Sequence, residues 1–220
     1  MKRILCFIES LGSGGAERQL TGLAVMLKQQ GYDVEVCYYV KKEFYLPYLQ
    51  DNGVNAIFLS EATSLRKRFF ALRKYISAYR PDSVISYSVS PSMITCLLKL
   101  LGMKFNLIVS ERSNTQKITN GVKLRFFLYH WADFIVPNSF SQGAFIKKQF
   151  PELTDKIKVI TNFVDTDVFS PKANSQVASR ETKMLCVGRI GPEKNVLRMI
   201  GAIGKVVKSG FDILWKSACY

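Results

Sequence analysis

Short apolar runs alternate along the chain with longer segments in which apolar residues recur at helical spacing. The segment from about Ala16 to Gln30 places its leucines on one helical face, and Gly31 can adopt the left-handed backbone that ends a helix. This alternation predicts an α/β fold: a parallel sheet with helices on both faces. The predicted strands cover residues 4–8, 34–40, 54–59, 83–87, 107–110, 134–137 and 158–161.

The pattern changes after residue 169. Residues 170–182 are polar, contain Pro171 and lack apolar periodicity, so they are interpreted as a linker. Residues 183–220 begin a second domain with one strand, one helix over 195–208 and a short further fragment. These few elements cannot cover both faces of a parallel sheet. The interpretation is a complete Rossmann-like domain over residues 1–169, followed by an incomplete, truncated second one.

Composition and charge narrow the function classes. The chain has 31 Lys and Arg against 17 Asp and Glu, and a net charge of +14 attracts anions without choosing among them. No DNA-recognition helix, RNA-binding aromatic signature or zinc module accompanies the basic residues, so no nucleic-acid partner is expected.

The cysteines and the apolar segments indicate where the protein is located. Five scattered cysteines are typical of reduced core residues. No apolar stretch reaches the roughly 20 residues of a spanning helix. We therefore expect a cytoplasmic protein.

A glycine-rich turn, residues 12–17, connects the first predicted strand to the first helix. Free N–H groups at a helix start favour an anion, so Gly14, Gly15 and Glu17 are candidate residues of a loop that binds phosphate or acceptor. The alternative is a tight connection without a ligand. A dinucleotide site is disfavoured, because Glu17 stands where its third glycine belongs and Lys41 and Lys42 replace the ribose-binding acid.

Four motifs occur in an order typical of one family: GGAERQL, WADFIVPNSFSQGAF, KVITNFVDTDVFSP and VGRIGPEKN. Together they resemble glycosyltransferase family 4. The resemblance implies a GT-B fold, with an acceptor-binding first domain and a donor-binding second domain. It also implies that a nucleoside diphosphate-sugar, expected to be a UDP-sugar, transfers its sugar with retention to a hydroxyl acceptor. The expected acceptor is a surface polysaccharide or lipid-linked glycan, and no cofactor or metal is expected.

The resemblance assigns Arg189 and Lys194 to the donor diphosphate. Two fixed cations would stabilise the negative charge that develops on phosphate as the sugar leaves. The alternative is that both are solvated loop charges. The family's E-x7-E acids, which bind the nucleotide ribose and the sugar, are expected further along the donor domain than these 220 residues reach, so the catalytic residues are unknown. A noncatalytic remnant that keeps only acceptor or membrane binding is therefore the alternative function.

Three further charged or titratable residues lie near predicted element ends. The family resemblance makes Glu111 and Arg112 cleft candidates, because they lie in the loop after the fifth strand where many relatives place a His. Arg112 either faces the acceptor or phosphate, or the two residues form a local ion pair. His130 is the only histidine and lies among aromatic residues, which favours packing over catalysis. One histidine and scattered cysteines predict no metal site.

A basic amphipathic helix is predicted over residues 64–80. Apolar residues line one face, and cations cluster beside it. Such a helix can lie on an anionic membrane surface, which would place the protein peripherally on the inner face of the membrane. The alternative is an ordinary surface helix of the fold. The candidate membrane-facing residues are Arg66, Lys67, Arg68, Arg73 and Lys74.

Overall fold

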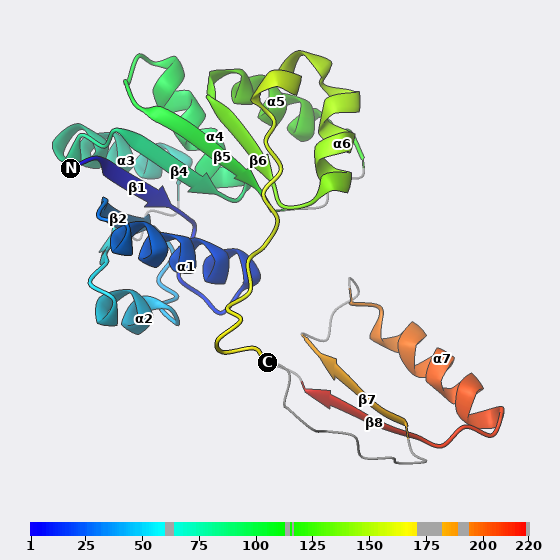
Figure 1. The fold of residues 1–220 in the computed structure, drawn as a ribbon. Helices are drawn as coiled ribbons and strands as arrows, with labels where there is room; N and C mark the ends of the chain where they lie inside the picture. The colour runs from blue at the N-terminus through cyan, green and yellow to red at the C-terminus, as the bar shows by residue number, and fades with distance from the viewer. Residues whose placement is uncertain (60–63, 113–114, 116, 171–181, 189–193, 219–220) are drawn as a thin grey trace. The chain divides into compact units, whose positions relative to one another are not determined.

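The computed structural model describes residues 1–59, 64–112, 115, 117–170, 182–188 and 194–218. The chain divides into two compact units, Met1–Val164 and Asp165–Tyr220. The first unit holds a six-stranded parallel sheet in the order β3-β2-β1-β4-β5-β6 (Figure 1). Its strands are β1 (Arg3–Phe7), β2 (Asp33–Tyr38), β3 (Asn55–Phe58), β4 (Ser83–Tyr87), β5 (Asn106–Glu111) and β6 (Phe134–Pro137).

Helices cover both faces of this sheet, as the alternating pattern predicts. Successive strand residues point to opposite faces, so Ile4 and Cys6 join one core cluster and Leu5 and Phe7 join the other. α1 (Gly15–Gln29) and α2 (Leu46–Asp51) cover the first cluster. The other cluster lies under α3 (Leu65–Tyr79), α4 (Val89–Leu100), α5 (Asn120–Leu128) and α6 (Phe140–Gln149); short 3-10 helices η1 (Tyr129–Trp131) and η2 (Pro151–Lys156) follow α5 and α6.

The predicted seventh strand of this sheet, residues 158–161, is wrong. Ile157 forms only an isolated bridge with Ile135. Beyond it, the Lys158 N–H donates to the Ile135 carbonyl at 3.0 Å, and the Ile160 N–H donates to the Pro137 carbonyl at 3.2 Å. The segment therefore follows the edge of β6 in an extended form without building a ladder. It then crosses the carboxyl ends of the strands, where Figure 1 shows it in yellow.

Residues 158–164, here called the exit segment, are fixed to the first helix. The Gln19 amide pairs with the Phe163 backbone twice, donating to its carbonyl at 2.9 Å and accepting from its N–H at 3.0 Å. The Phe163 ring lies over Gly22, where a Cβ atom would be 2.3 Å from the ring. The GGAERQL and KVITNF motifs are thus in contact, although they are far apart in the sequence.

The second unit contains β7 (Thr182–Val187), α7 (Val196–Lys208) and β8 (Ile213–Ala218), with β7 and β8 paired in parallel. None of the residues of α7 is buried. The apolar side chains Leu185 and Leu197 are 70% and 85% exposed. The described elements of this unit therefore leave their apolar faces open. Most of the predicted linker, residues 171–181, lies outside the described residues.

Candidate active-site edge of the sheet

The glycine-rich turn brings Gly14, Gly15 and Glu17 together at the start of α1. Gly14 is the N-cap, and Glu17 lies in the first turn of the helix. The Glu17 carboxylate folds back over Gly14, where a Cβ atom would be only 2.2 Å from its Oε2. Its Oε1 accepts from the Ser10 hydroxyl at 3.3 Å, and that hydroxyl accepts from the Gly12 N–H at 3.4 Å. The protein's own carboxylate thus supplies negative charge to this helix start, as N3 glutamates do.

A pocket of about 520 Å³ lies at the carboxyl ends of β1 and β4. The order of strands reverses between these two neighbours, because β2 follows β1 on one side of the sheet and β5 follows β4 on the other. Ligands of doubly wound folds bind in the crevice that forms at this switch point. The pocket is lined by Glu9, Leu65, Ser88, Val89, Ser90 and Met93.

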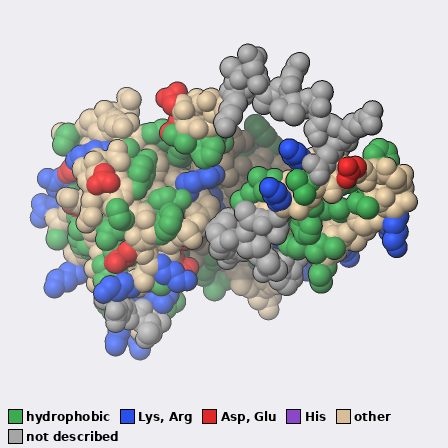
Figure 2. All heavy atoms as spheres, turned by 90° about the horizontal axis from the view of Figure 1, so that it is seen from below, with side chains coloured by type: hydrophobic (Ala, Val, Ile, Leu, Met, Phe, Trp, Pro, Cys, Tyr) green, Lys and Arg blue, Asp and Glu red, His purple; other side chains and the backbone are tan. Residues whose placement is uncertain are grey.

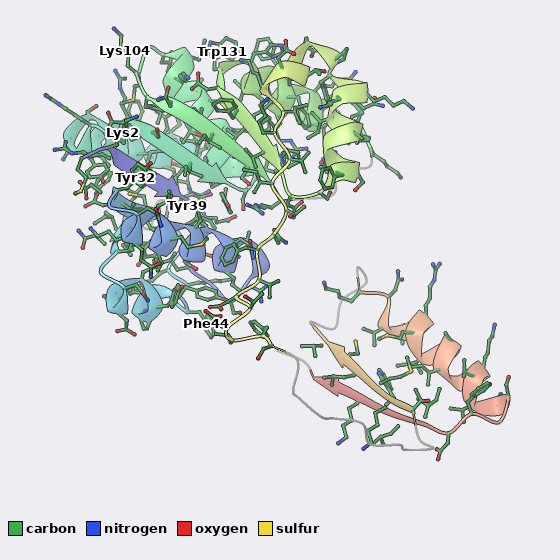
Figure 3. The ribbon with its side chains drawn as sticks, viewed as in Figure 1. Lys2, Tyr32, Tyr39, Phe44, Lys104 and Trp131 are labelled. Carbon is green, nitrogen blue, oxygen red and sulfur yellow. The ribbon has the colours of Figure 1, made fainter. Side chains whose placement is uncertain are left out.

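Hydrogen bonds from the end of β2 hold two residues that line this pocket, Glu9 and Ser90. The Glu9 carbonyl accepts from the N–H groups of Tyr39 and Val40 at 3.1 and 2.9 Å. Tyr39 is buried at the end of β2 (Figure 3), and its hydroxyl donates to Ser90 Oγ at 3.2 Å. Burial raises the pKa of Tyr39, which keeps this hydroxyl protonated. Sequence reasoning missed these residues, although Glu9 and Ser88 are the polar residues that directly follow two predicted strands.

A larger pocket, of about 690 Å³, lies at the opposite edge of the sheet. It includes Asp82 and Asn106 at the amino ends of strands, together with Lys104 and Trp131, which Figure 3 shows at the far end of the unit from Phe44. Ligands of this fold bind at the carboxyl edge. We therefore assign the candidate site to the smaller pocket.

The side chains of the consecutive residues Glu111 and Arg112 have different surroundings and different partners. Glu111 is buried and pairs with Arg125, with 3.4 Å between Oε2 and Nη1, while the Tyr129 hydroxyl donates to its Oε1 at 2.5 Å. Burial raises the pKa of Glu111, and Arg125 and Tyr129 offset part of that rise. The local ion pair with Arg112 does not form. Glu111 instead fixes α5 and η1 to the end of β5.

Arg112 faces the carboxyl edge of the sheet. Its guanidinium lies 4.2 Å from the centre of the Tyr87 ring and donates to the Tyr87 hydroxyl. It also donates to Asn162 Oδ1 at 2.7 Å, so it joins β4 to the exit segment. The Arg112 Nε is buried without a hydrogen-bond partner in the described structure. Its predicted contact with acceptor or phosphate stays a prediction.

The two predicted donor-binding cations belong to the second unit. Arg189 lies outside the described residues. Lys194 is exposed just before α7, and its Cε would lie 3.9 Å from a Cβ atom on Gly188, at the end of β7. Lys194 is therefore at the carboxyl end of a parallel strand, where the corresponding edge of a Rossmann-like domain binds its ligand.

The basic helix predicted over residues 64–80 is α3, and its cations differ in their surroundings. Arg66, Lys67, Arg73 and Lys74 are exposed. Arg68 is half-buried, with its guanidinium 4.3 Å from the centre of the Tyr39 ring. On the face of the first unit drawn in Figure 2, Lys and Arg side chains form several groups, with Asp and Glu side chains scattered between them.

Three other sequence expectations concern packing, metals and membrane spans. His130 is exposed in η1, where its ring lies 6.2 Å from the Phe127 ring and its Nδ1 lies 2.9 Å from the Phe127 carbonyl oxygen, so it packs against an aromatic neighbour at the surface. The described residues contain no group of three His, Cys, Asp or Glu side chains placed to hold a metal ion. Within the same residues, no helix has the length and apolar character to cross a bilayer.

The fold and the crevice at the strand reversal define a Rossmann-like α/β domain of the kind that binds ligands at its carboxyl edge. The particular family follows from the sequence. The profile of Glycosyltransferase Family 4 matches residues 13–168, so the chain belongs to this family and the predicted resemblance is confirmed.

Two curated relatives are similar to most of the chain. The N-acetylgalactosamine-N,N'-diacetylbacillosaminyl-diphospho-undecaprenol 4-alpha-N-acetylgalactosaminyltransferase of Campylobacter jejuni is 27% identical over 94% of the chain and 60% of its own length. The amylovoran biosynthesis glycosyltransferase AmsD of Erwinia amylovora is 27% identical over 97% of the chain and 61% of its own length. The chain thus spans about three fifths of these relatives.

A solved structure confirms the fold. Anabaena HepE, crystallised with UDP-glucose, superposes with a TM-score of 0.72 at 12% identity, covering 100% of this chain and 70% of its own. The predicted GT-B type of fold, with a Rossmann-like first domain covered by helices on both faces, is therefore confirmed.

Proposed function

We propose that this chain is part of a glycosyltransferase that moves a sugar from a nucleoside diphosphate-sugar, most simply a UDP-sugar, to a hydroxyl acceptor. The observation that carries the proposal is the family match over residues 13–168, which covers the carboxyl ends of β2 to β6 and the loops that follow them. The relatives named above build glycans, one of them on a diphospho-undecaprenol carrier. A lipid-linked or polysaccharide acceptor is the matching proposal for this chain.

The proposal divides the chemistry between the two units. The first unit takes the acceptor at its carboxyl edge, and the second takes the diphosphate through Arg189 and Lys194. Positive groups fixed at this position stabilise the charge that develops on the leaving phosphate. An arginine can also hold phosphate through two nitrogen atoms. No metal or cofactor enters this proposal.

Calorimetric titration with UDP and UDP-sugars tests the donor site. We expect the parent chain to bind and the variant Arg189→Ala/Lys194→Ala to lose binding at least about tenfold, the effect of removing charged hydrogen bonds. The variant Lys205→Ala/Lys208→Ala removes two exposed cations from the same unit and serves as the matched control. Absence of binding by the parent would instead favour the noncatalytic alternative.

We further propose that α3 lies on an anionic membrane surface, which would place the protein peripherally on the inner face of the membrane. Phe70 is 61% exposed. Its neighbours at i−4, i−3, i+3 and i+4 on the helix are Arg66, Lys67, Arg73 and Lys74. Each Lys or Arg near the surface of an anionic membrane contributes about 1 kcal/mol to the binding free energy. An aromatic ring within a cationic face suits the boundary between headgroups and acyl chains.

Flotation with phosphatidylglycerol vesicles tests this docking. We expect Phe70→Ala to reduce the bound fraction several-fold, whereas Phe140→Ala, which removes a ring that is 75% exposed on α6, should not. Changing all four exposed cations of α3 to Gln should remove the salt-sensitive part of binding. A matched variant with Lys183, Arg198, Lys205 and Lys208 changed to Gln has the same net charge. Equal losses in the two charge variants would contradict docking through α3.

A further inference from the structure

The pocket at the switch point between β1 and β4 has a composition that restricts its ligand. Glu9 contributes a carboxylate, and Ser88 and Ser90 contribute hydroxyl groups. Leu65, Val89 and Met93 supply the apolar part of the lining. No Lys or Arg is among these six residues, although the chain as a whole carries a net charge of +14. Arg68 of the adjoining helix lies over the Tyr39 ring.

This composition fits a neutral polyhydroxyl ring better than an anion. A carboxylate accepts hydrogen bonds from two hydroxyl groups at once and repels phosphate. Serine hydroxyls both donate and accept. Apolar side chains can cover the C–H face of a sugar ring, because that face has no hydrogen-bonding group to satisfy. A volume of about 520 Å³ is within the range of small-molecule pockets.

Two residues of the pocket are held by contacts within the protein before any ligand binds. The backbone of Glu9 is fixed by two N–H groups at the end of β2, and Ser90 is held by the Tyr39 hydroxyl at 3.2 Å. Ser88 has φ 76°, a left-handed value that a residue with a side chain rarely adopts. Backbone strain of this kind is concentrated at functional sites. Rigid placement reduces the ordering cost of binding.

We propose that this pocket binds a neutral sugar of the acceptor, with the Glu9 carboxylate accepting hydrogen bonds from its ring hydroxyls. The inference rests on the proposed function and adds to it the chemical class of the group bound and the residue that selects it. A sugar bearing phosphate at this position would be rejected by Glu9. Ser90 contacts the same ring, and Tyr39 acts as a positioning residue behind it.

The test uses the full chain with ¹³C-methyl methionine, because Met93 lines the pocket and Met26 on α1 does not. The Met93 signal is assigned with Met93→Leu. The probes are the methyl glycosides of glucose, galactose, N-acetylglucosamine and N-acetylgalactosamine, up to about 50 mM, which detects millimolar dissociation constants. The corresponding sugar 1-phosphates form the second arm.

We expect at least one methyl glycoside to shift the Met93 signal and leave Met26 unchanged. Glu9→Gln should weaken that binding about tenfold or more, as loss of a charged hydrogen bond predicts, and Glu152→Gln, an exposed control, should not. The other methionine signals of Glu9→Gln report whether the variant is folded.

Two results would overturn the inference: no shift of Met93 with any neutral glycoside, or tighter binding of the sugar 1-phosphates than of the glycosides. UDP titration separates this failure from failure of the proposed function, because it reads the second unit. A chain that binds UDP but no glycoside keeps the proposed function and loses this inference.

Discussion

At the scale of single residues, Gly143 shows why a glycine stands in the motif WADFIVPNSFSQGAF. It is buried in α6, and a Cβ atom there would lie 2.7 Å from Val159 Cγ2. Val159 belongs to the motif KVITNFVDTDVFSP, so the two motifs are in contact at this point. Only a glycine allows α6 to approach the exit segment this closely.

We expect Gly143→Ala to lower the free energy of unfolding by about 1 to 3 kcal/mol through overpacking. This loss occurs although alanine is a better helix former than glycine by about 1 kcal/mol. In a Val159→Ala background the same change should be neutral or stabilising, because the methyl group that it meets is gone. Urea unfolding of the double-mutant cycle measures the difference.

Gly121→Ala in α5 is the control, since a Cβ atom there meets nothing closer than Thr119 Oγ1 at 3.8 Å. It should leave stability unchanged or raise it slightly. If Gly143→Ala destabilised the protein equally with and without the Val159 side chain, the contact would not be the cause.

The same scale shows what the sequence could not reveal about the site. The family resemblance makes Glu111 and Arg112 candidates in the loop after the fifth strand, and both lie at the carboxyl edge. Their partners could not be predicted. Arg112 meets Tyr87 and Asn162, which are 25 and 50 residues away. Contacts over such separations are set by the order of strands in the sheet, which local patterns do not specify.

At the scale of elements, the apolar runs predicted β4 and β6 with their observed bounds, and the helix expected from about residue 16 begins at Gly15. Buried strands give continuous apolar runs, which explains this agreement. The false strand at residues 158–161 has the same composition. It forms no ladder with β6, and directly after it Asn162 and Phe163 make tertiary contacts with Arg112 and α1.

Asp133 joins three elements at the opposite edge of the sheet. Its Oδ2 accepts from the Leu107 N–H at 2.6 Å, at the start of β5, and from the Lys99 ammonium of α4. Burial acts to raise the pKa of Asp133, but hydrogen bonds from Lys99 and Leu107 and the charges of Lys99 and Lys156 lower it overall. The carboxylate therefore stabilises the fold in its ionised form.

We expect Asp133→Asn to lower the free energy of unfolding by about 1 kcal/mol at neutral pH, less than a buried charged hydrogen bond contributes, because solvent screens a side chain that is 39% exposed. A lowered carboxyl pKa gives stability that is present above the ordinary value of about 3.9 and lost as pH falls through the folded-state value. The gap between parent and variant should therefore close on acidification. Urea unfolding from pH 7 to pH 3 measures it.

Asp155→Asn removes an exposed carboxylate in η2 and is the control for this series. Its curve should follow that of the parent. A gap between parent and Asp133→Asn that stayed constant with pH would show that the carboxylate acts through packing and not through its charge.

At the scale of the whole molecule, burial is distributed unequally between the two units. Every buried hydrophobic residue of the described chain lies at or before Ile157. The second unit shows a large share of hydrophobic side chains on the face drawn in Figure 2, and its exposed residues include Leu185, Leu197 and Phe211. Apolar surface of this kind favours association between molecules. The stability of the chain and its tendency to associate therefore belong to different units.

We expect a chain shortened after Val164 to keep the urea midpoint of the first unit, because its core and the Phe163 contact are intact. Self-association of the full chain, measured by sedimentation velocity, should disappear in the shortened one. In the full chain, Leu185→Glu/Leu197→Glu should reduce association in the same way, since a charge on an apolar contact surface opposes burial. A full chain that remained monomeric at all concentrations, or a shortened chain that associated equally, would show that the exposed apolar side chains of β7 and α7 do not cause association.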